Sequence, residues 1–205
     1  MAAAANTLVI ACGALAREFI ALRQANAWSH IDVTCLPAEL HNRPEKIPGL
    51  VREKIQRFKV QYPHIFVAYA DCGTGGLLDT VLQEEGVQRL PGAHCYEFDA
   101  GSAAFAQMAE AELGTFYLTD FLLRHFERLI MHGLGIDKHP QLLPVYFGNY
   151  TTVMYLCQKE SPEGMALGQA AAKRLGLAFA YRVTSYGEME TELKTVSEKV
   201  IQWQN

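Results

Sequence analysis

Short runs of apolar residues alternate with amphipathic segments along most of the chain, and this alternation restricts the fold more than any other feature. Thr7–Cys12 and residues 64–70 are continuously apolar, as strands buried on both faces are, and glycine-containing turns follow both. Residues 14–28 and 77–85 carry apolar side chains at helical spacing. Strands separated by helices pair in parallel through βαβ units. We therefore expect an α/β fold, with a mostly parallel sheet flanked by helices in three layers.

The same alternation continues toward the end of the chain. It predicts strands at residues 31–36, 87–90, 151–156 and 178–184, and helices at residues 47–58, 102–112, 115–132, 163–175 and 187–201. A length of 205 residues is typical of one compact domain. We expect a single domain over residues 1–205. The alternative is two lobes, residues 1–133 and 150–205, around a cleft, because residues 133–150 have the composition of a long loop.

Charge and hydropathy exclude several classes of partner. The net charge is −4 and the isoelectric point is near 6.0, so neither nucleic acid nor an anionic membrane is expected as the main partner. No stretch approaches the roughly 20 apolar residues of a membrane helix, and residues 1–5 lack the features of a secretion signal. We expect a cytoplasmic protein that acts on a small-molecule substrate or a protein partner, with its oligomeric state left open.

The five cysteines are the chemically most informative residues. An odd number spread over the chain argues against a disulfide framework and for reduced thiols. Cys12 and Cys72 each follow a buried strand and precede a glycine, at the sheet edge where α/β proteins bind ligands. Backbone amides and a helix N-terminus favour thiolate at such a position. Cys35 and Cys157 lie within strand-like runs with no glycine after them, and we expect both to be core residues.

A third loop of the same kind contains His94 and Cys95, and His41 lies in the loop after the intervening strand. Three thiolates and one imidazole satisfy a tetrahedral zinc ion, whereas three thiolates with an open position hold an iron–sulfur cluster. The ligand set predicted for a metal is Cys12, Cys72, His94 and Cys95. His41 is the alternative to His94 as the fourth ligand or proton shuttle. The predicted catalytic residues are His41, Asp120 and Glu97, the last two in support. Because no two cysteines form a CxxC pair, the alternative is that these thiols are ordinary buried residues.

Three further positions allow more than one interpretation. Gly73, Thr74, Gly75 and Gly76 have the composition of a nest that binds phosphate or carboxylate at a helix start, or of a simple tight turn. This segment lacks the lysine of a P-loop and the spacing of a dinucleotide fingerprint. Asp120 is favoured as a helix cap, with a role beside a ligating histidine or as a proton acceptor as the alternatives. Cys72 could also be a nucleophile with His41 or His94 as its base.

Several strings of the sequence together resemble one protein family. They are CGALA from Cys12, LHNRP from Leu40, YADCGTGG from Tyr69, HCYE from His94 and GTFYLTD from Gly114. As a set they resemble DUF1638, an uncharacterised bacterial and archaeal family, over almost the whole chain. Members of that family are often encoded beside corrinoid-dependent methyltransferases of the trimethylamine type and their corrinoid proteins. The resemblance implies a role in one-carbon transfer.

The residues and the resemblance together support three hypotheses. The first is a zinc enzyme, or an accessory protein, of corrinoid-linked methyl transfer, in which zinc activates a substrate thiol or polarises a leaving group. The second is an iron–sulfur enzyme that uses the same three cysteines. The third is a non-catalytic module that binds a corrinoid or pterin, or a chaperone for the methyltransferase. The chain lacks the Asp-x-His-x-x-Gly string of many corrinoid carriers, which argues against a classical carrier.

Overall fold

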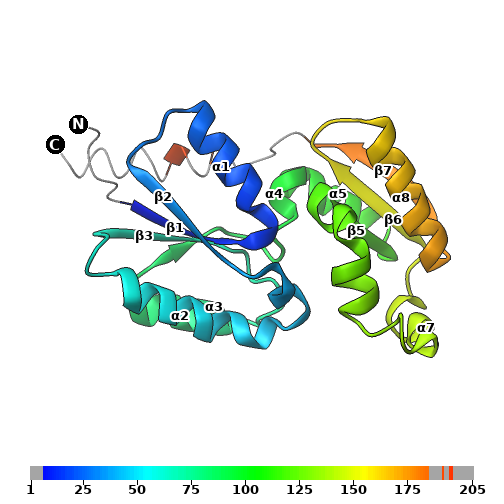
Figure 1. Ribbon diagram of the computed structural model, residues 1–205, viewed down its shortest axis with the longest axis horizontal. Helices are drawn as coiled ribbons and strands as arrows, with labels where there is room; N and C mark the ends of the chain where they lie inside the picture. The colour runs from blue at the N-terminus through cyan, green and yellow to red at the C-terminus, as the bar shows by residue number, and fades with distance from the viewer. Residues whose placement is uncertain (1–6, 185–190, 192–193, 196–205) are drawn as a thin grey trace. The chain divides into compact units, whose positions relative to one another are not determined.

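The computed structural model describes residues 7–184, 191 and 194–195. The described residues divide into two compact units, the first formed by residues 7–95, 191 and 194–195 and the second by residues 96–184. Each unit contains its own parallel sheet flanked by helices (Figure 1), so the α/β class is confirmed with two small sheets in place of one. Apart from residues 191 and 194–195, the helix expected over residues 187–201 lies outside the described residues. No helix in the described part of the chain is long and apolar enough to span a membrane.

The first unit has a four-stranded sheet in the order β2-β1-β3-β4, with every pairing parallel. Its strands are β1 (Thr7–Cys12), β2 (Ile31–Leu36), β3 (His64–Ala68) and β4 (Gln88–Arg89). Its helices are α1 (Ala16–Ala25), α2 (Ile47–Phe58) and α3 (Leu77–Glu85), with 3-10 turns η1 (Gly13–Leu15), η2 (Ala38–Asn42) and η3 (Pro44–Lys46). Figure 1 shows α1 on one face of the sheet and α2 and α3 on the other.

Strand β1 forms the centre of the first unit, and all six of its residues are buried. Both faces of the strand are covered by helices, which explains why its sequence is continuously apolar rather than alternating. Helix α2 packs with a stripe formed by Ile47, Val51 and Ile55, which recur at four-residue spacing and are at most 1% exposed. The apolar pattern of the sequence therefore maps directly onto the three layers of this unit.

The strand order creates a topological switch point between β1 and β3. The chain leaves β1 through α1 toward β2 on one side, and later leaves β3 through α3 toward β4 on the other side. Since α1 and α3 lie on opposite faces (Figure 1), their first turns diverge at the carboxyl ends of these two strands. Open α/β sheets bind their ligands at this point. Cys12 ends β1, and Cys72 lies in the loop that follows β3.

The second unit has a three-stranded parallel sheet in the order β5-β6-β7. Its strands are β5 (Thr115–Thr119), β6 (Thr152–Cys157) and β7 (Ala178–Val183). Its helical segments are α4 (Glu97–Ala100), α5 (Ser102–Ala111), α6 (Asp120–Arg124), the π-helix η4 (Glu127–His132), η5 (Pro140–Leu142), α7 (Leu143–Phe147) and α8 (Pro162–Leu175). Helix α8 packs closely because Gly168 faces the ring of Phe179, which a Cβ atom at that position would approach to 2.6 Å.

The prediction of one helix over residues 115–132 was wrong for its first five residues, which form β5. These residues, TFYLT, are β-branched, aromatic or leucine, and such side chains favour strands. The strand ends where the hydroxyl of Thr119 accepts a hydrogen bond from the amide of Leu122 and caps α6. A continuous apolar run does not show by itself where a strand gives way to a helix.

Candidate functional site

The side chains of Cys12, Cys72 and Cys95 come together at the carboxyl end of the first sheet. The Sγ atoms of Cys72 and Cys95 lie 2.8 Å apart, and the Cys95 thiol also lies within hydrogen-bonding reach of Cys12. All five cysteines of the chain are free thiols. Cys12 is buried, and the other two are partly exposed. Three thiols from three separate loops thus form one cluster, which we call the thiol cluster.

Backbone hydrogen bonds between two loops bring Cys72 and Cys95 together. The amide of Asp71 donates to the carbonyl of Gly92 over 3.1 Å, and the amide of Cys72 donates to the carbonyl of Ala93 over 2.7 Å. These bonds extend the parallel pairing of β3 and β4 beyond the ends of both strands. The position of Cys95 therefore depends on the loop that follows β4.

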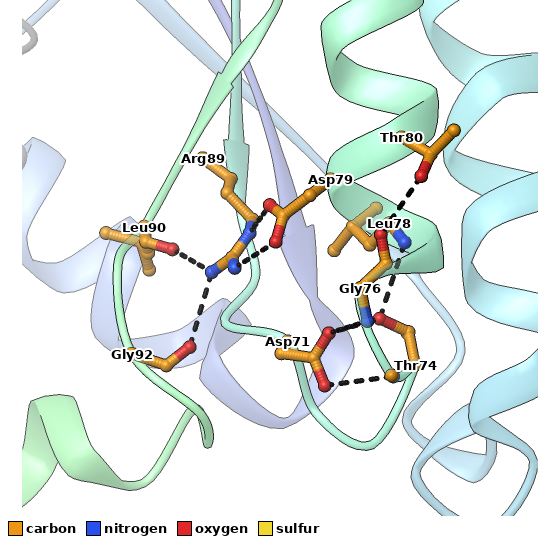
Figure 2. A network of polar contacts seen from close by, with 10 residues as sticks. Asp71, Thr74, Gly76, Leu78, Asp79, Thr80, Arg89, Leu90 and Gly92 are labelled. Atoms are coloured by element: carbon orange, nitrogen blue, oxygen red, sulfur yellow. Dashed lines mark hydrogen bonds and ion pairs between the residues drawn. The ribbon is translucent and has the colours of Figure 1, made fainter.

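Arg89 fastens that loop to the start of α3 (Figure 2). Its Nε and Nη2 atoms donate to the two carboxylate oxygens of Asp79 over 2.6 and 2.9 Å. Its Nη1 atom donates to the carbonyls of Leu90 and Gly92 over 2.6 and 3.3 Å. The hydrogen bonds from Arg89 lower the pKa of Asp79, so the pair stays ionised at neutral pH. A bidentate arginine that also holds two carbonyls is a geometrically specific clamp on the loop.

The carboxylate of Asp71 fills the turn formed by residues 73–76 (Figure 2). Its Oδ1 atom accepts from the hydroxyl of Thr74 over 2.6 Å and from the amide of Gly76 over 2.9 Å, and Oδ2 accepts from Gly75 over 3.1 Å. Two of the amides that one of the two interpretations of the sequence offered to an external phosphate or carboxylate thus bind a carboxylate of the chain itself. An external anion would have to displace Asp71 to bind the predicted nest of Gly73, Thr74, Gly75 and Gly76.

We expect Asp71→Asn to make the first unit less sensitive to acid. Burial of Asp71 opposes ionisation, but the hydrogen bonds from Thr74, Gly76 and Gly75 lower its pKa below the ordinary value of 3.8. A carboxyl whose pKa is lower in the folded state stabilises the fold above pH 3.8, and this contribution is lost as pH falls through the folded-state pKa. Acid unfolding followed by circular dichroism measures the difference. The asparagine variant should be less stable than wild type at neutral pH and should lose less stability on acidification; parallel losses in both proteins would contradict the assignment.

Backbone conformation orients two of the thiols. Cys72 has a φ of +50°, a left-handed conformation that is unfavourable for a residue with a Cβ atom and that recurs at functional sites. Gly13 directly follows Cys12, and a Cβ atom there would lie 2.7 Å from the carbonyl oxygen of Leu36. Glycine therefore lets the chain turn sharply beside β2 immediately after Cys12.

Hydrogen bonds within the thiol cluster shift the pKa values of Cys12 and Cys95 in opposite directions. The pKa of Cys12 is lowered, chiefly because its sulfur accepts from the Cys95 thiol, although burial works in the opposite direction. The amides of Ala14 and Leu15 and the hydroxyl of Tyr69 also donate to this sulfur and lower its pKa further. The pKa of Cys95 is raised well above its ordinary value, because its thiol hydrogen-bonds with Cys12 and Cys72 and because burial of its sulfur opposes the thiolate. The arrangement favours a thiolate at Cys12 and a protonated thiol at Cys95.

Tyr69 lies at the cluster and was not singled out from the sequence. It is 1% exposed, and its hydroxyl lies within hydrogen-bonding reach of the Cys12 sulfur. Burial raises the pKa of Tyr69, and the nearby sulfurs of Cys12, Cys95 and Cys72 raise it further, so the hydroxyl remains a donor. One feature of the sequence could have indicated Tyr69. It directly follows a buried strand, as Cys12 ends the neighbouring one.

The predicted histidines lie near each other in the first unit. His41 belongs to η2, and its pKa is lowered because surrounding protein atoms shield the ring and because His94 lies close by. Part of the His41 side chain nevertheless remains exposed. The other two predicted catalytic residues, Glu97 and Asp120, belong to the second unit. Glu97 begins α4 and is buried.

Asp120 joins two strand ends of the second sheet. Its Oδ1 atom accepts a hydrogen bond from the hydroxyl of Tyr155, and its Oδ2 atom accepts from the amide of Gln158 over 2.9 Å. Thr119, rather than Asp120, caps α6. Cys157 is fully buried nearby, where its thiol donates to the carbonyl of Arg182 over 3.5 Å. These contacts assign Asp120 a structural position at the ends of β5 and β6.

Within the described residues, no group of three or more His, Cys, Asp or Glu side chains has the arrangement of a formed metal site. The 2.8 Å separation of the Cys72 and Cys95 sulfurs means that these thiols contact each other rather than surround a space. A metal ion would therefore have to part them.

Comparison with models of known protein families identifies the family to which the chain belongs. The model of the family described as protein of unknown function (DUF1638) matches residues 35–193. This confirms the resemblance seen in the sequence. The matched range includes Cys72, His94 and Cys95, whereas Cys12 precedes it. Neither the curated proteins nor the solved structures include a match.

Proposed function

Since this chain belongs to the DUF1638 family, we propose that its first unit binds a zinc ion through Cys12, Cys72 and Cys95 and serves corrinoid-linked methyl transfer, as an enzyme or accessory protein. The reaction class rests on the expectation, drawn from the family resemblance, that members of the family are encoded beside corrinoid-dependent methyltransferases. The partner under this proposal is a corrinoid protein or its methyltransferase. Reduced thiols fit a cytoplasmic location.

The observation that carries the proposal is the meeting of three thiols at the switch point of a parallel sheet. If these three cysteines were only core residues, nothing would require them to meet at the sheet edge where α/β proteins bind ligands, because they are far apart in the sequence. Thiolates are soft ligands that select zinc and other thiophilic metals over magnesium or calcium. Cys12, at which thiolate is favoured, is the member best prepared to bind an ion first.

The spacing of the sulfurs supports a single ion over a cluster. Two thiolates on one tetrahedral zinc ion lie about 3.8 Å apart, given Zn–S bonds of about 2.3 Å. The sulfurs of Cys72 and Cys95 need to separate only modestly from 2.8 Å to reach that distance. An iron–sulfur cluster would instead distribute the thiolates over different iron atoms and require a larger rearrangement.

The fourth position of the ion is proposed for His94, for His41 or for a substrate. A histidine ligand must be neutral, and the lowered pKa of His41 favours its neutral form. Zinc lowers the pKa of a bound thiol, which makes the thiol a methyl acceptor, or it polarises a leaving group. Three thiolates with one exchangeable position would leave room for that chemistry.

Metal content and colour test the proposal. The chain is purified without oxygen, and its metals are measured by elemental analysis together with its visible absorption spectrum. We expect one zinc ion per chain and no visible band. A brown protein with iron and sulfide would establish the iron–sulfur alternative instead. A protein that binds neither metal, even after incubation with zinc under reducing conditions, would contradict metal binding altogether.

We expect Arg89→Ala to weaken zinc binding about tenfold, as loss of outer-shell support does in other metal sites. The alanine variant loses both the bond to Asp79 and the bonds that hold the loop carrying Cys95. Competition with a chelating dye measures the affinity. Arg52→Ala is the matched control, because Arg52 pairs with Glu84 on the surface of the same unit. Equal affinities of the two variants would contradict a role for Arg89 in positioning Cys95.

A further inference from the structure

The thiols of Cys72 and Cys95 are held in contact by the two loops that carry them. Their Sγ atoms lie 2.8 Å apart, and both cysteines are free. The amide of Cys72 donates to the carbonyl of Ala93 over 2.7 Å, so the backbones of the two loops are joined close to the sulfurs. A disulfide forms without backbone movement only between cysteines that are already close in space. The structure meets that condition at Cys72 and Cys95.

The three members of the thiol cluster differ in their exposure. Cys72 and Cys95 are partly exposed, whereas Cys12 is buried and only 6% exposed. A small oxidant therefore reaches Cys72 or Cys95 before it reaches Cys12. The arrangement keeps Cys95 protonated, and a thiol reacts far more slowly with oxidants than a thiolate does. Oxidation of the thiol cluster therefore begins at Cys72.

The surroundings of Cys12 make its sulfur an acceptor of protons. The sulfur accepts hydrogen bonds from the Cys95 thiol, from the Tyr69 hydroxyl and from two backbone amides, and each of these bonds lowers the pKa of Cys12. A sulfur that accepts several hydrogen bonds is favoured as thiolate. The proton that Cys95 must lose before its sulfur becomes a nucleophile thus already points at Cys12.

We infer that Cys72 and Cys95 form a reversible disulfide on reaction with a hydroperoxide such as hydrogen peroxide, with Cys12 as the acceptor of the Cys95 proton. The inference goes beyond the proposed function and requires no metal ion. It assigns the thiol cluster a modification that changes with the supply of oxidant, in which Cys12 itself stays reduced.

In the first step, the Cys72 thiolate attacks one oxygen of hydrogen peroxide. The S–O bond forms and the O–O bond breaks, so Cys72 becomes a sulfenic acid. The other oxygen leaves as hydroxide and takes up the proton that Cys72 has released, which gives water. The oxidant is thereby reduced by two electrons, and these electrons come from the Cys72 sulfur.

In the second step, Cys95 gives its proton to the Cys12 sulfur and attacks the sulfur of Cys72. The S–S bond forms and the S–O bond breaks, as in the condensation of any sulfenic acid with a thiol. The departing hydroxide takes the proton from Cys12 and leaves as a second water. Two thiols and one hydrogen peroxide are thus converted into one disulfide and two waters.

Disulfide mapping of the full chain tests the inference. The reduced chain, kept free of metal by excess chelator, is treated with hydrogen peroxide, and the remaining thiols are alkylated after denaturation. Mass spectrometry of a digest then identifies the state of each cysteine. We expect a peptide pair linked through Cys72 and Cys95, recovery of both thiols with dithiothreitol, and alkylation of Cys12, Cys35 and Cys157.

Three variants separate the roles of the thiols. In Cys95→Ser, the sulfenic acid at Cys72 should persist and react with dimedone. In Cys12→Ser, the disulfide should form about a hundredfold more slowly, because a serine hydroxyl does not take up the proton of Cys95. Cys35→Ser is the matched control and should react like wild type, because Cys35 lies within β2 of the same unit, outside the thiol cluster. Circular dichroism confirms that each variant is folded.

The map of the wild type decides the pairing even where a variant fails to fold. A disulfide between Cys12 and either of its neighbours would overturn the inference, as would alkylation of all five cysteines after exposure to peroxide. Oxidation of Cys72 that dithiothreitol does not reverse would also overturn it. Equal rates in wild type and folded Cys12→Ser would contradict the role of Cys12 as proton acceptor. Because the chelator removes metal throughout, none of these results depends on whether the chain binds zinc.

Discussion

Replacing Asp120 with alanine should lower the free energy of unfolding of the second unit by about 3 kcal/mol. The substitution removes the acceptor of both the Tyr155 hydroxyl and the Gln158 amide, and each group left unpaired in a partly buried position costs about 1–3 kcal/mol. Tyr155 is 2% exposed, so water reaches its hydroxyl poorly. Urea unfolding followed by circular dichroism measures the loss.

Two further variants make this prediction specific. Asp120→Asn keeps one oxygen acceptor and should lose about half as much stability. Glu112→Ala is the matched control, because the Glu112 carboxylate also accepts two hydrogen bonds, from Thr151 and Thr152, but lies exposed on the surface. Its removal should have a much smaller effect. Equal losses for Asp120→Ala and Glu112→Ala would show that Asp120 does not join the ends of β5 and β6 as described.

Zinc should stabilise the chain strongly under reducing conditions. A ligand that binds only the folded state at a free concentration of a hundred times its dissociation constant adds about 2.7 kcal/mol to the free energy of unfolding. Because the thiol cluster unites loops after β1, β3 and β4, unfolding of the first unit would disperse its ligands. Chemical denaturation with zinc, and again with excess chelator, measures the difference.

Magnesium provides the control for this second prediction. It is a hard cation that prefers oxygen ligands, so it should leave the stability of the chain unchanged at the same free concentration. Stabilisation by both ions would indicate binding to surface carboxylates. No stabilisation by zinc at any concentration below that which causes aggregation would argue against a preformed thiol site.

The sequence predicted the positions of the thiols better than the contacts around them. A buried run followed by Cys-Gly identifies a strand end, which is why Cys12 and Cys72 could be assigned to one edge of a sheet. Their meeting with Cys95 depends on β3 lying directly between β1 and β4. That strand order comes from long-range packing, which local patterns do not specify.

Two residues at the cluster show what local patterns leave out. Tyr69 was counted among the apolar residues of a buried strand, and its importance emerges only from the register between β1 and β3. Asp71 precedes a glycine-rich turn, and aspartate commonly accepts hydrogen bonds from backbone amides a few residues later. That tendency could have indicated that the turn binds its own carboxylate. The strand at Thr115–Thr119 was concealed by the apolar helix that follows it.

Zinc content of five single cysteine variants tests the central claim most directly. Each cysteine is replaced by serine, and metal is measured by elemental analysis after loading under reducing conditions. We predict that Cys12→Ser, Cys72→Ser and Cys95→Ser each lose stoichiometric zinc, while Cys35→Ser and Cys157→Ser, if folded, retain one ion per chain. Circular dichroism confirms folding in each case. Retention of zinc by any folded variant of the first three would contradict a single site built from the thiol cluster.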